Sequence, residues 1–170
     1  MGKLKRSCVC DIIGTLNQNV KELSTATMDL QQFRIAHSTV MEHYQFIERE
    51  LEGIYAALSG KSLYIGLKNV ETLSISKVIR MVQEQEKIHD IEIISDTEYE
   101  NLKSICLRRN FWTHNCYTEM VFDRKTGGPK KQIDIIQLYD DIRNAEQMRE
   151  LLFNRKIELF HNIRDKGTLW

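Results

Sequence analysis

Seven consecutive residues, 108–114, bring together side chains that can bind a phosphate group and transfer protons. The stretch reads Arg-Arg-Asn-Phe-Trp-Thr-His, so Arg109 precedes His114 by five positions and Asn110 directly follows the arginine. A guanidinium is permanently charged and offers planar donors that suit a phosphate. An imidazole titrates near neutral pH and can act as a base or an acid. These residue types indicate phosphodiester chemistry, with Asn110 placed to orient the histidine or to bind a phosphate oxygen.

The element that positions this stretch is a helix predicted to begin after Ser95. Ser95 followed by Glu98 is the signature of a capping box. Apolar residues share one side of this helix with Arg109: Leu102, Ile105, Cys106, Trp112, Cys116 and Met120. A second set lies on roughly the opposite side: Leu107, Phe111, His114, Thr118 and Val121. A helix that is apolar on both sides is buried on both, and in a chain this short the second covering surface is expected to be another protomer.

The rest of the chain also predicts helices. Apolar residues at steps of three and four indicate further amphipathic helices in four segments: 9–23, 25–59, 70–82 and 138–163. Ser24-Thr25 offers an N-cap for the longest segment, Ser59-Gly60 suits its end, and Gly167 lies near the end of the last. The third helix is expected to fade through the polar run 83–87. The segment 60–68 has no clean period and predicts a connection with a short extended piece, and 88–94 fits a strand, a loop or a helix end.

The region 123–131 is predicted to be a loop because Gly127-Gly128-Pro129 interrupts any helix. The apolar pairs on either side, at 121–122 and 133–135, fit a small hairpin. The loop brings four basic side chains close to the end of the predicted helix: Arg124, Lys125, Lys130 and Lys131.

The composition of the chain argues against several classes of protein. The 170 residues suit one domain spanning 1–170, and the balance of 24 basic against 24 acidic residues argues against a non-specific nucleic-acid coat. The single proline favours long helices over a β-sandwich. No apolar run is long enough for a signal peptide or a membrane span, so we expect a cytoplasmic protein with reduced thiols. Cys8 and Cys10 lack a second cysteine pair, and His37 and His43 do not share a helix face, so no metal or other cofactor is expected.

The motif Arg109-Asn110-Phe111-Trp112-Thr113-His114 resembles the signature of the HEPN family, in which an arginine is followed by a polar residue, three more residues and a histidine. The likeness covers the motif, its place on a late helix and the helical layout. It implies an all-α, up-and-down bundle of about four to five helices. It also implies a metal-independent endoribonuclease, often a toxin or phage-defence effector restrained by an antitoxin or regulatory protein. Such domains dimerise so that two motifs share a cleft, which makes Arg109, Asn110 and His114 the expected catalytic residues.

The resemblance gives a further set of residues an expected role. Arg108, Lys125, Lys130 and Lys131 are candidates to guide RNA toward the cleft, and a solvated charged loop is the alternative. Some family members carry a tyrosine two residues after the histidine, which a partner nucleotidyltransferase modifies. Tyr117 lies three residues after His114, so that type of antitoxin does not follow from this sequence.

The sequence leaves open one question of geometry and three alternative roles for the chain. Five residues on a regular helix place Arg109 and His114 about 140° apart, so a deformed helix near Trp112 or a two-fold mate must complete a site. Arg109 could instead pair with an acidic residue of a neighbouring helix while His114 is a buried core histidine. The chain could also be a non-catalytic module that binds a nucleotide or a protein, or a structural dimer built on the helix at 25–59.

Overall fold

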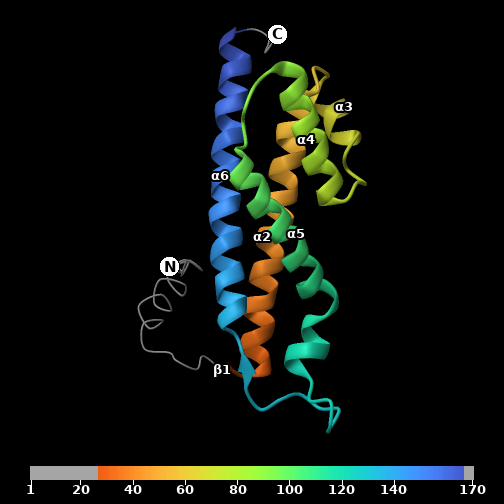
Figure 1. The fold of residues 1–170 in the computed structure, drawn as a ribbon, viewed down its shortest axis with the longest axis vertical. Coiled ribbons are helices and arrows are strands. Elements are labelled where there is room, and N and C mark those ends of the chain that lie inside the picture. Colours follow the sequence, from red (N-terminus) through yellow and green to blue (C-terminus); the bar gives the residue numbers. More distant parts are fainter. Residues whose placement is uncertain (1–26, 167–170) are drawn as a thin grey trace, which may run out of the picture.

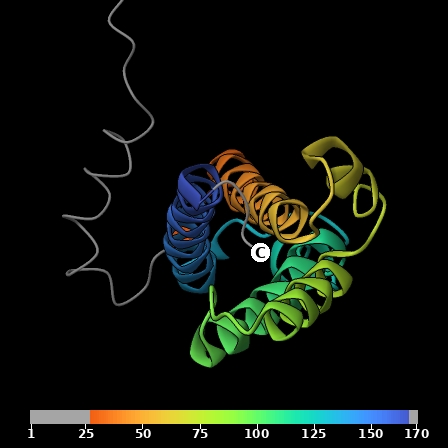
Figure 2. The same ribbon diagram turned by 90° about the horizontal axis from the view of Figure 1, so that it is seen from above.

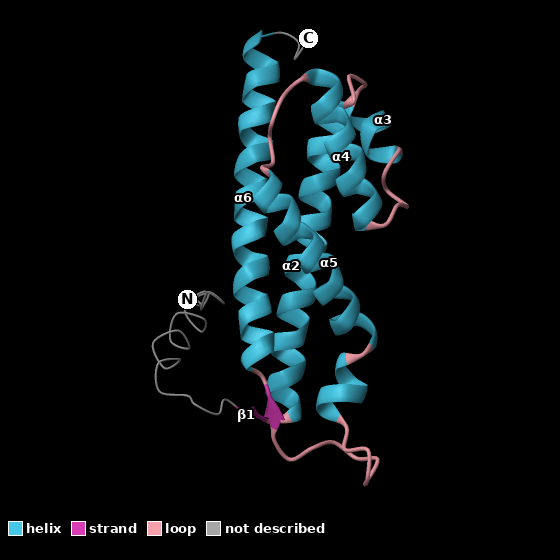
Figure 3. Cartoon of the chain, in the orientation of Figure 1, coloured by secondary structure: helices cyan, strands magenta, loops and turns pink. Residues whose placement is uncertain are grey.

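The computed structural model describes residues 27–166, and this part of the chain is mainly helical (Figure 1, Figure 3). The elements, in chain order, are β1 (Thr27–Met28), α2 (Leu30–Leu58), α3 (Leu63–Lys68), α4 (Ile75–His89), α5 (Asp96–His114), the π-helical turn η2 (Tyr117–Val121), β2 (Ile133–Asp134) and α6 (Ile136–Lys166). The predicted all-α helical bundle is therefore confirmed. The helix predicted at 9–23, the cap at Ser24-Thr25 and the Cys8–Cys10 pair lie outside the described residues.

Four helices, α2, α4, α5 and α6, enclose the apolar core (Figure 2). The contact of Lys156 with Glu50 and that of Arg149 with Phe46 show that α2 and α6 run in the same direction. α5 runs opposite to α2, α4 and α6, so the directions do not simply alternate along the chain as an up-and-down order implies (Figure 1). None of the helices described is both long and apolar enough to pass through a bilayer.

The long helix α2 begins and ends at local signals in the sequence. The Asp29 carboxylate accepts hydrogen bonds from the backbone N–H groups of Gln31 and Gln32, at 2.8 and 2.9 Å, and the Gln32 side chain completes a capping box. Ser59 caps the C-terminus, and Gly60 then adopts the left-handed conformation that releases the chain from the helix. The predicted end at Ser59-Gly60 is confirmed.

The segment 60–68 is not the partly extended connection that was predicted, because it contains the short helix α3, which packs beside the end of α2 (Figure 2). Gly66 is its one buried residue, and a Cβ added there would lie 2.7 Å from the Ala56 Cα on α2. The large apolar residues of α3 face solvent: Leu63, Tyr64, Ile65 and Leu67. A six-residue helix anchored through a glycine shows no apolar period, which explains the wrong prediction.

Helix α4 also departs from its predicted bounds, since it continues through the polar run 83–87 and ends at His89. Asp90 terminates it in the left-handed conformation, and 91–95 is then a loop. Glu86 is buried within the polar run, where its carboxylate accepts bonds from the Ile93 and Ile94 N–H groups and from the Tyr99 hydroxyl, at 2.8, 2.9 and 2.6 Å. Glu86 thus places the polar run 83–87 against the rest of the fold, and α4 continues through this run.

The predicted hairpin between 121–122 and 133–135 is wrong in its pairing. Phe122 bridges Pro129 instead, which closes a shorter turn. β2 pairs with β1 in an antiparallel register that places Met28 opposite Ile133. Both of these side chains belong to the core, so burial of apolar surface selects β1 as the partner of β2.

Candidate functional site

The stretch 108–114 forms the last two turns of α5. The helix is regular through its last residue, His114, and the wider hydrogen bonding of η2 begins only at Tyr117. Five residues on a regular helix correspond to a rotation of about 140°. The deformation considered near Trp112 therefore lies beyond the motif, and a single protomer holds Arg109 and His114 on different faces of α5.

Arg109 faces α2, where its Nη2 donates a hydrogen bond of 3.1 Å to the Glu48 carboxylate. The two side chains are 29% and 21% exposed, so solvent still reaches the pair. The Arg109 Nε is buried, and the described residues offer it no hydrogen-bond acceptor. The alternative that Arg109 pairs with an acid of a neighbouring helix is thus what the structure shows.

The neighbouring arginine is held much more firmly. Arg108 Nε donates to Asp141 Oδ2 on α6 at 2.7 Å, and its Nη2 lies 2.7 Å from the same oxygen. The Trp112 indole N–H donates to this oxygen at 2.6 Å. The guanidinium also lies over the rings of Phe111 and Trp112, at 4.9 and 5.5 Å from their centres. Asp141 is buried, so Arg108 compensates its charge and ties α5 to α6.

His114 and Asn110 lie one helical turn apart on an exposed face of α5. Neither side chain takes part in a hydrogen bond or ion pair with another of the residues 27–166. Leu107 lies one further turn back and is 71% exposed. The alternative that His114 is a buried core histidine is therefore wrong. Residues 27–166 leave Leu107 and His114 exposed on the second side of α5, whereas they half-bury Phe111 and bury Val121.

The surroundings of Arg109 on the α2 side are acidic. Burial raises the pKa of the Glu52 carboxyl, and the negative charges of Glu48 and Glu71 raise it further. Cys106 is buried beside the pair. Burial raises the pKa of its thiol, the Arg109 charge opposes this rise, and the Glu48 charge adds to it. The guanidinium thus points toward the Glu48 carboxylate, in a region where the charges of Glu52 and Glu71 are opposed by that of Arg49.

The C-terminal end of α5 is packed against α2 through aromatic rings. His37 Nε2 lies 2.9 Å from the Trp112 carbonyl oxygen and donates to it in the tautomer that carries the proton there. The Tyr117 ring packs edge-on against Phe33 and His37, with centres 5.6 and 5.7 Å apart. These contacts fix the turn that follows His114 and leave Tyr117 half-buried.

The candidate RNA-guiding lysines Lys125, Lys130 and Lys131 are exposed on the loop that follows η2. The turn is closed by the Gly127 N–H bonded to the Asp123 carbonyl at 2.8 Å, with Gly127 in the left-handed conformation. Lys130 Nζ donates to the Glu119 carbonyl at 3.3 Å. The loop lies at the same end of the bundle as the end of α5, as predicted from the sequence (Figure 1). A role for these lysines in RNA binding stays a prediction.

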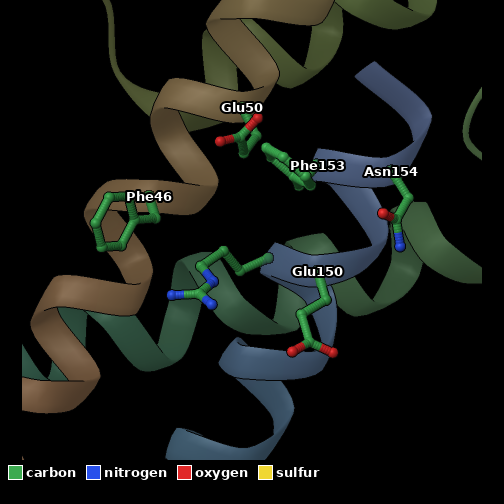
Figure 4. A pocket seen from close by; sticks show the side chains of 6 residues that line it. Phe46, Glu50, Glu150, Phe153 and Asn154 are labelled. Atoms are coloured by element: carbon green, nitrogen blue, oxygen red, sulfur yellow. The ribbon is translucent and has the colours of Figure 1, made fainter. Parts of the chain in front are cut away.

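A separate hollow of about 510 Å³ lies between α2 and α6 (Figure 4). It is lined by Phe46, Glu50, Arg149, Glu150, Phe153 and Asn154. The sequence did not single out these residues, and none of the predicted site residues lines the hollow. Among the residues that line the hollow, Glu50 is paired with Lys156, and the Arg149 guanidinium lies 5.4 Å from the centre of the Phe46 ring.

No cluster of three or more His, Cys, Asp or Glu side chains within residues 27–166 is arranged to hold a metal ion. Comparisons with protein-family models, with curated proteins and with solved structures find no match to this chain.

Proposed function

We propose that the chain is a metal-independent endoribonuclease of HEPN type, active as a homodimer whose two α5 helices share one cleft. The observation that carries the proposal is the exposed face of α5, on which the side chains of His114 and Asn110 make no hydrogen bond or ion pair within residues 27–166. Arg109 directly precedes Asn110 and makes one hydrogen bond, to the carboxylate of Glu48, whose side chain is 21% exposed. In the setting that the resemblance implies, the enzyme acts in the cytoplasm as a toxin or phage-defence effector restrained by a partner protein.

The chemistry follows from the residue types. The 2′-hydroxyl of RNA attacks the adjacent phosphorus after losing its proton, and the 5′-oxygen leaves after gaining one. The products are a 2′,3′-cyclic phosphate and a 5′-hydroxyl. One histidine cannot be base and acid in the same step, so the two His114 side chains of a dimer share these roles. The guanidinium of Arg109 stabilises the charge that develops on the phosphate, and Asn110 orients His114 or donates to a phosphate oxygen.

A dimer would also bring together catalytic side chains that a single protomer holds apart. Because Arg109 and His114 lie about 140° apart on α5, one chain does not present both to one phosphate. A two-fold axis across α5, level with residues 111–112, would bring His114 of one chain toward Arg109 of the other, and the interface around it would cover the exposed Leu107. The exposed apolar side chain supports this arrangement, since its burial removes apolar surface from water.

A second candidate is a non-catalytic module that binds a nucleotide or a protein. The Arg109–Glu48 pair favours it, because a carboxylate that neutralises the guanidinium gives the arginine a structural use without any phosphate. The two candidates differ in whether RNA is cut and in whether His114 is needed.

The test is a cleavage assay on a mixed RNA pool in EDTA. Parent protein, His114→Ala and Arg109→Ala are compared with His161→Ala, which removes an exposed histidine of α6. We expect parent and His161→Ala to leave cyclic-phosphate ends, and the other two variants to lose at least about a hundredfold in rate. Equal cleavage by folded, dimeric His114→Ala would refute the assignment. No cleavage by any of the four would leave the binding module as the better function.

A further inference from the structure

The Arg109–Glu48 contact is weak for an ion pair between two packed helices. It consists of one hydrogen bond of 3.1 Å, whereas a guanidinium has five N–H groups to donate. Arg108, at the preceding position, has two nitrogens 2.7 Å from the buried carboxylate of Asp141, which also accepts a hydrogen bond from Trp112. Arg109 is therefore the arginine of this pair that can change partners at small cost.

The direction in which Arg109 points matters for a phosphate ligand. Its guanidinium lies against α2 and pairs with Glu48, and nearby Glu52 experiences the negative charges of Glu48 and Glu71 and the opposing charge of Arg49. A phosphate that approached the guanidinium along this edge would be repelled by Glu48, the carboxylate already paired with it. His114 and Asn110 occupy a different face of α5, so in the proposed dimer a phosphate beside His114 of one chain binds Arg109 of the other chain only if that guanidinium leaves Glu48.

We propose that Glu48 restrains Arg109 and that an RNA phosphate replaces this carboxylate as the partner of the guanidinium when substrate binds. This inference rests on the proposed function, because it assigns a regulatory partner to the arginine of that site. Glu48 is a positioning residue, since it acts on RNA only through Arg109. The exchange breaks no covalent bond and replaces one anionic partner of Arg109 by another. A modest difference between the affinities of the guanidinium for the carboxylate and for the phosphate therefore decides which partner it binds.

The proposal predicts that a substitution of Glu48, next to the site, strengthens RNA binding. Glu48→Gln keeps the size of the side chain and removes the negative charge that competes with phosphate. RNA should therefore bind this variant more tightly, by roughly two- to fivefold, which is the scale of an exposed ion pair. Arg109→Ala should abolish the effect, because without the guanidinium Glu48 has no influence on RNA beyond its general charge.

The experiment measures the dissociation constant of a fluorescent, single-stranded RNA whose 2′-O-methyl groups prevent cleavage. The proteins are the parent, Glu48→Gln, Arg109→Ala and the double variant. Glu42→Gln serves as the matched control, since it removes an exposed glutamate from the same helix and changes the net charge equally. Thermal unfolding of each variant confirms that the fold is kept. Cleavage of unmodified RNA in EDTA is measured in parallel.

Tighter binding by Glu48→Gln than by Glu42→Gln, lost in the Arg109→Ala background, is the expected result. It would support the restraint even if no protein cleaved RNA, in which case only the nuclease assignment would fail. Cleavage by the parent together with unchanged or weaker binding by Glu48→Gln would overturn the restraint and leave the nuclease intact. An equal gain in the presence and absence of Arg109 would also overturn it, since the effect would then be general charge repulsion. Absence of RNA binding by all variants would overturn both.

Discussion

Removal of the Asp141 carboxylate should strongly destabilise the protein, because it is the shared acceptor that ties the α5 motif to α6. Asp141 is 7% exposed and lies on α6 facing α5. One of its oxygens accepts from Arg108 and Trp112, and the other accepts from Gln137 at 3.3 Å. Asp141→Ala would leave the Arg108 guanidinium and the buried indole N–H of Trp112 without this acceptor.

The expected loss follows from these contacts. Breaking a largely buried ion pair by removing one partner costs about 3–5 kcal/mol, and a buried N–H left without an acceptor costs about 1–3 kcal/mol. Arg108 is 28% exposed and can recover part of its hydration, so the two contributions do not add fully. We expect a loss of about 4 kcal/mol from a folding free energy of roughly 5–15 kcal/mol. Asp141→Asn keeps an oxygen for Trp112 and should lose about half as much.

The assay is urea unfolding at neutral pH, followed by circular dichroism. Asp140→Ala is the matched control, because this neighbouring aspartate is exposed and its contact with Arg143 is 3.9 Å long. The control should change the free energy of unfolding by less than about 0.5 kcal/mol. A loss below about 1 kcal/mol for Asp141→Ala, or one equal to that of the control, would show that the Asp141 network does not hold α5 to α6.

Two further predictions concern packing and pH. Gly66→Ala should destabilise the protein by about 1–3 kcal/mol in the same assay, because its Cβ would lie 2.7 Å from the backbone of α2 and outweigh the better helix propensity of alanine. Gly53→Ala should be close to neutral, since its Cβ meets the flexible Lys156 side chain, and equal losses for the two variants would contradict this reasoning. Burial lowers the pKa of His43 below its usual 6.5, so the unfolded chain takes up the proton first and stability should fall as the pH drops below 6.5. His43→Gln should show a flatter pH dependence of unfolding between about pH 5 and 7, and an unchanged slope would argue against the buried neutral imidazole.

The class of fold and several helix ends could be predicted from the amino-acid sequence. Ser95 with Glu98 marked the start of α5, and Ser59-Gly60 marked the end of α2, because caps are hydrogen bonds between residues close in the chain. The periodic apolar residues of α2 and α6 predicted their buried faces for the same reason, since a helix face is set by a spacing of three and four residues. The motif of Arg109 and His114 could also be found, with its angular separation of about 140°.

The contacts of these side chains could not be predicted from the sequence, because they depend on how the helices pack. Arg109 meets Glu48 across 61 positions, and Arg108 meets Asp141 across 33, although the two arginines are neighbours with the same chemistry. The exposure of His114, the partner of β2 and the helical state of 63–68 likewise depend on which surfaces meet when the bundle closes. Local hydrogen bonds and spacing are written in short stretches of sequence, whereas ion pairs between helices arise from burial summed over the whole core.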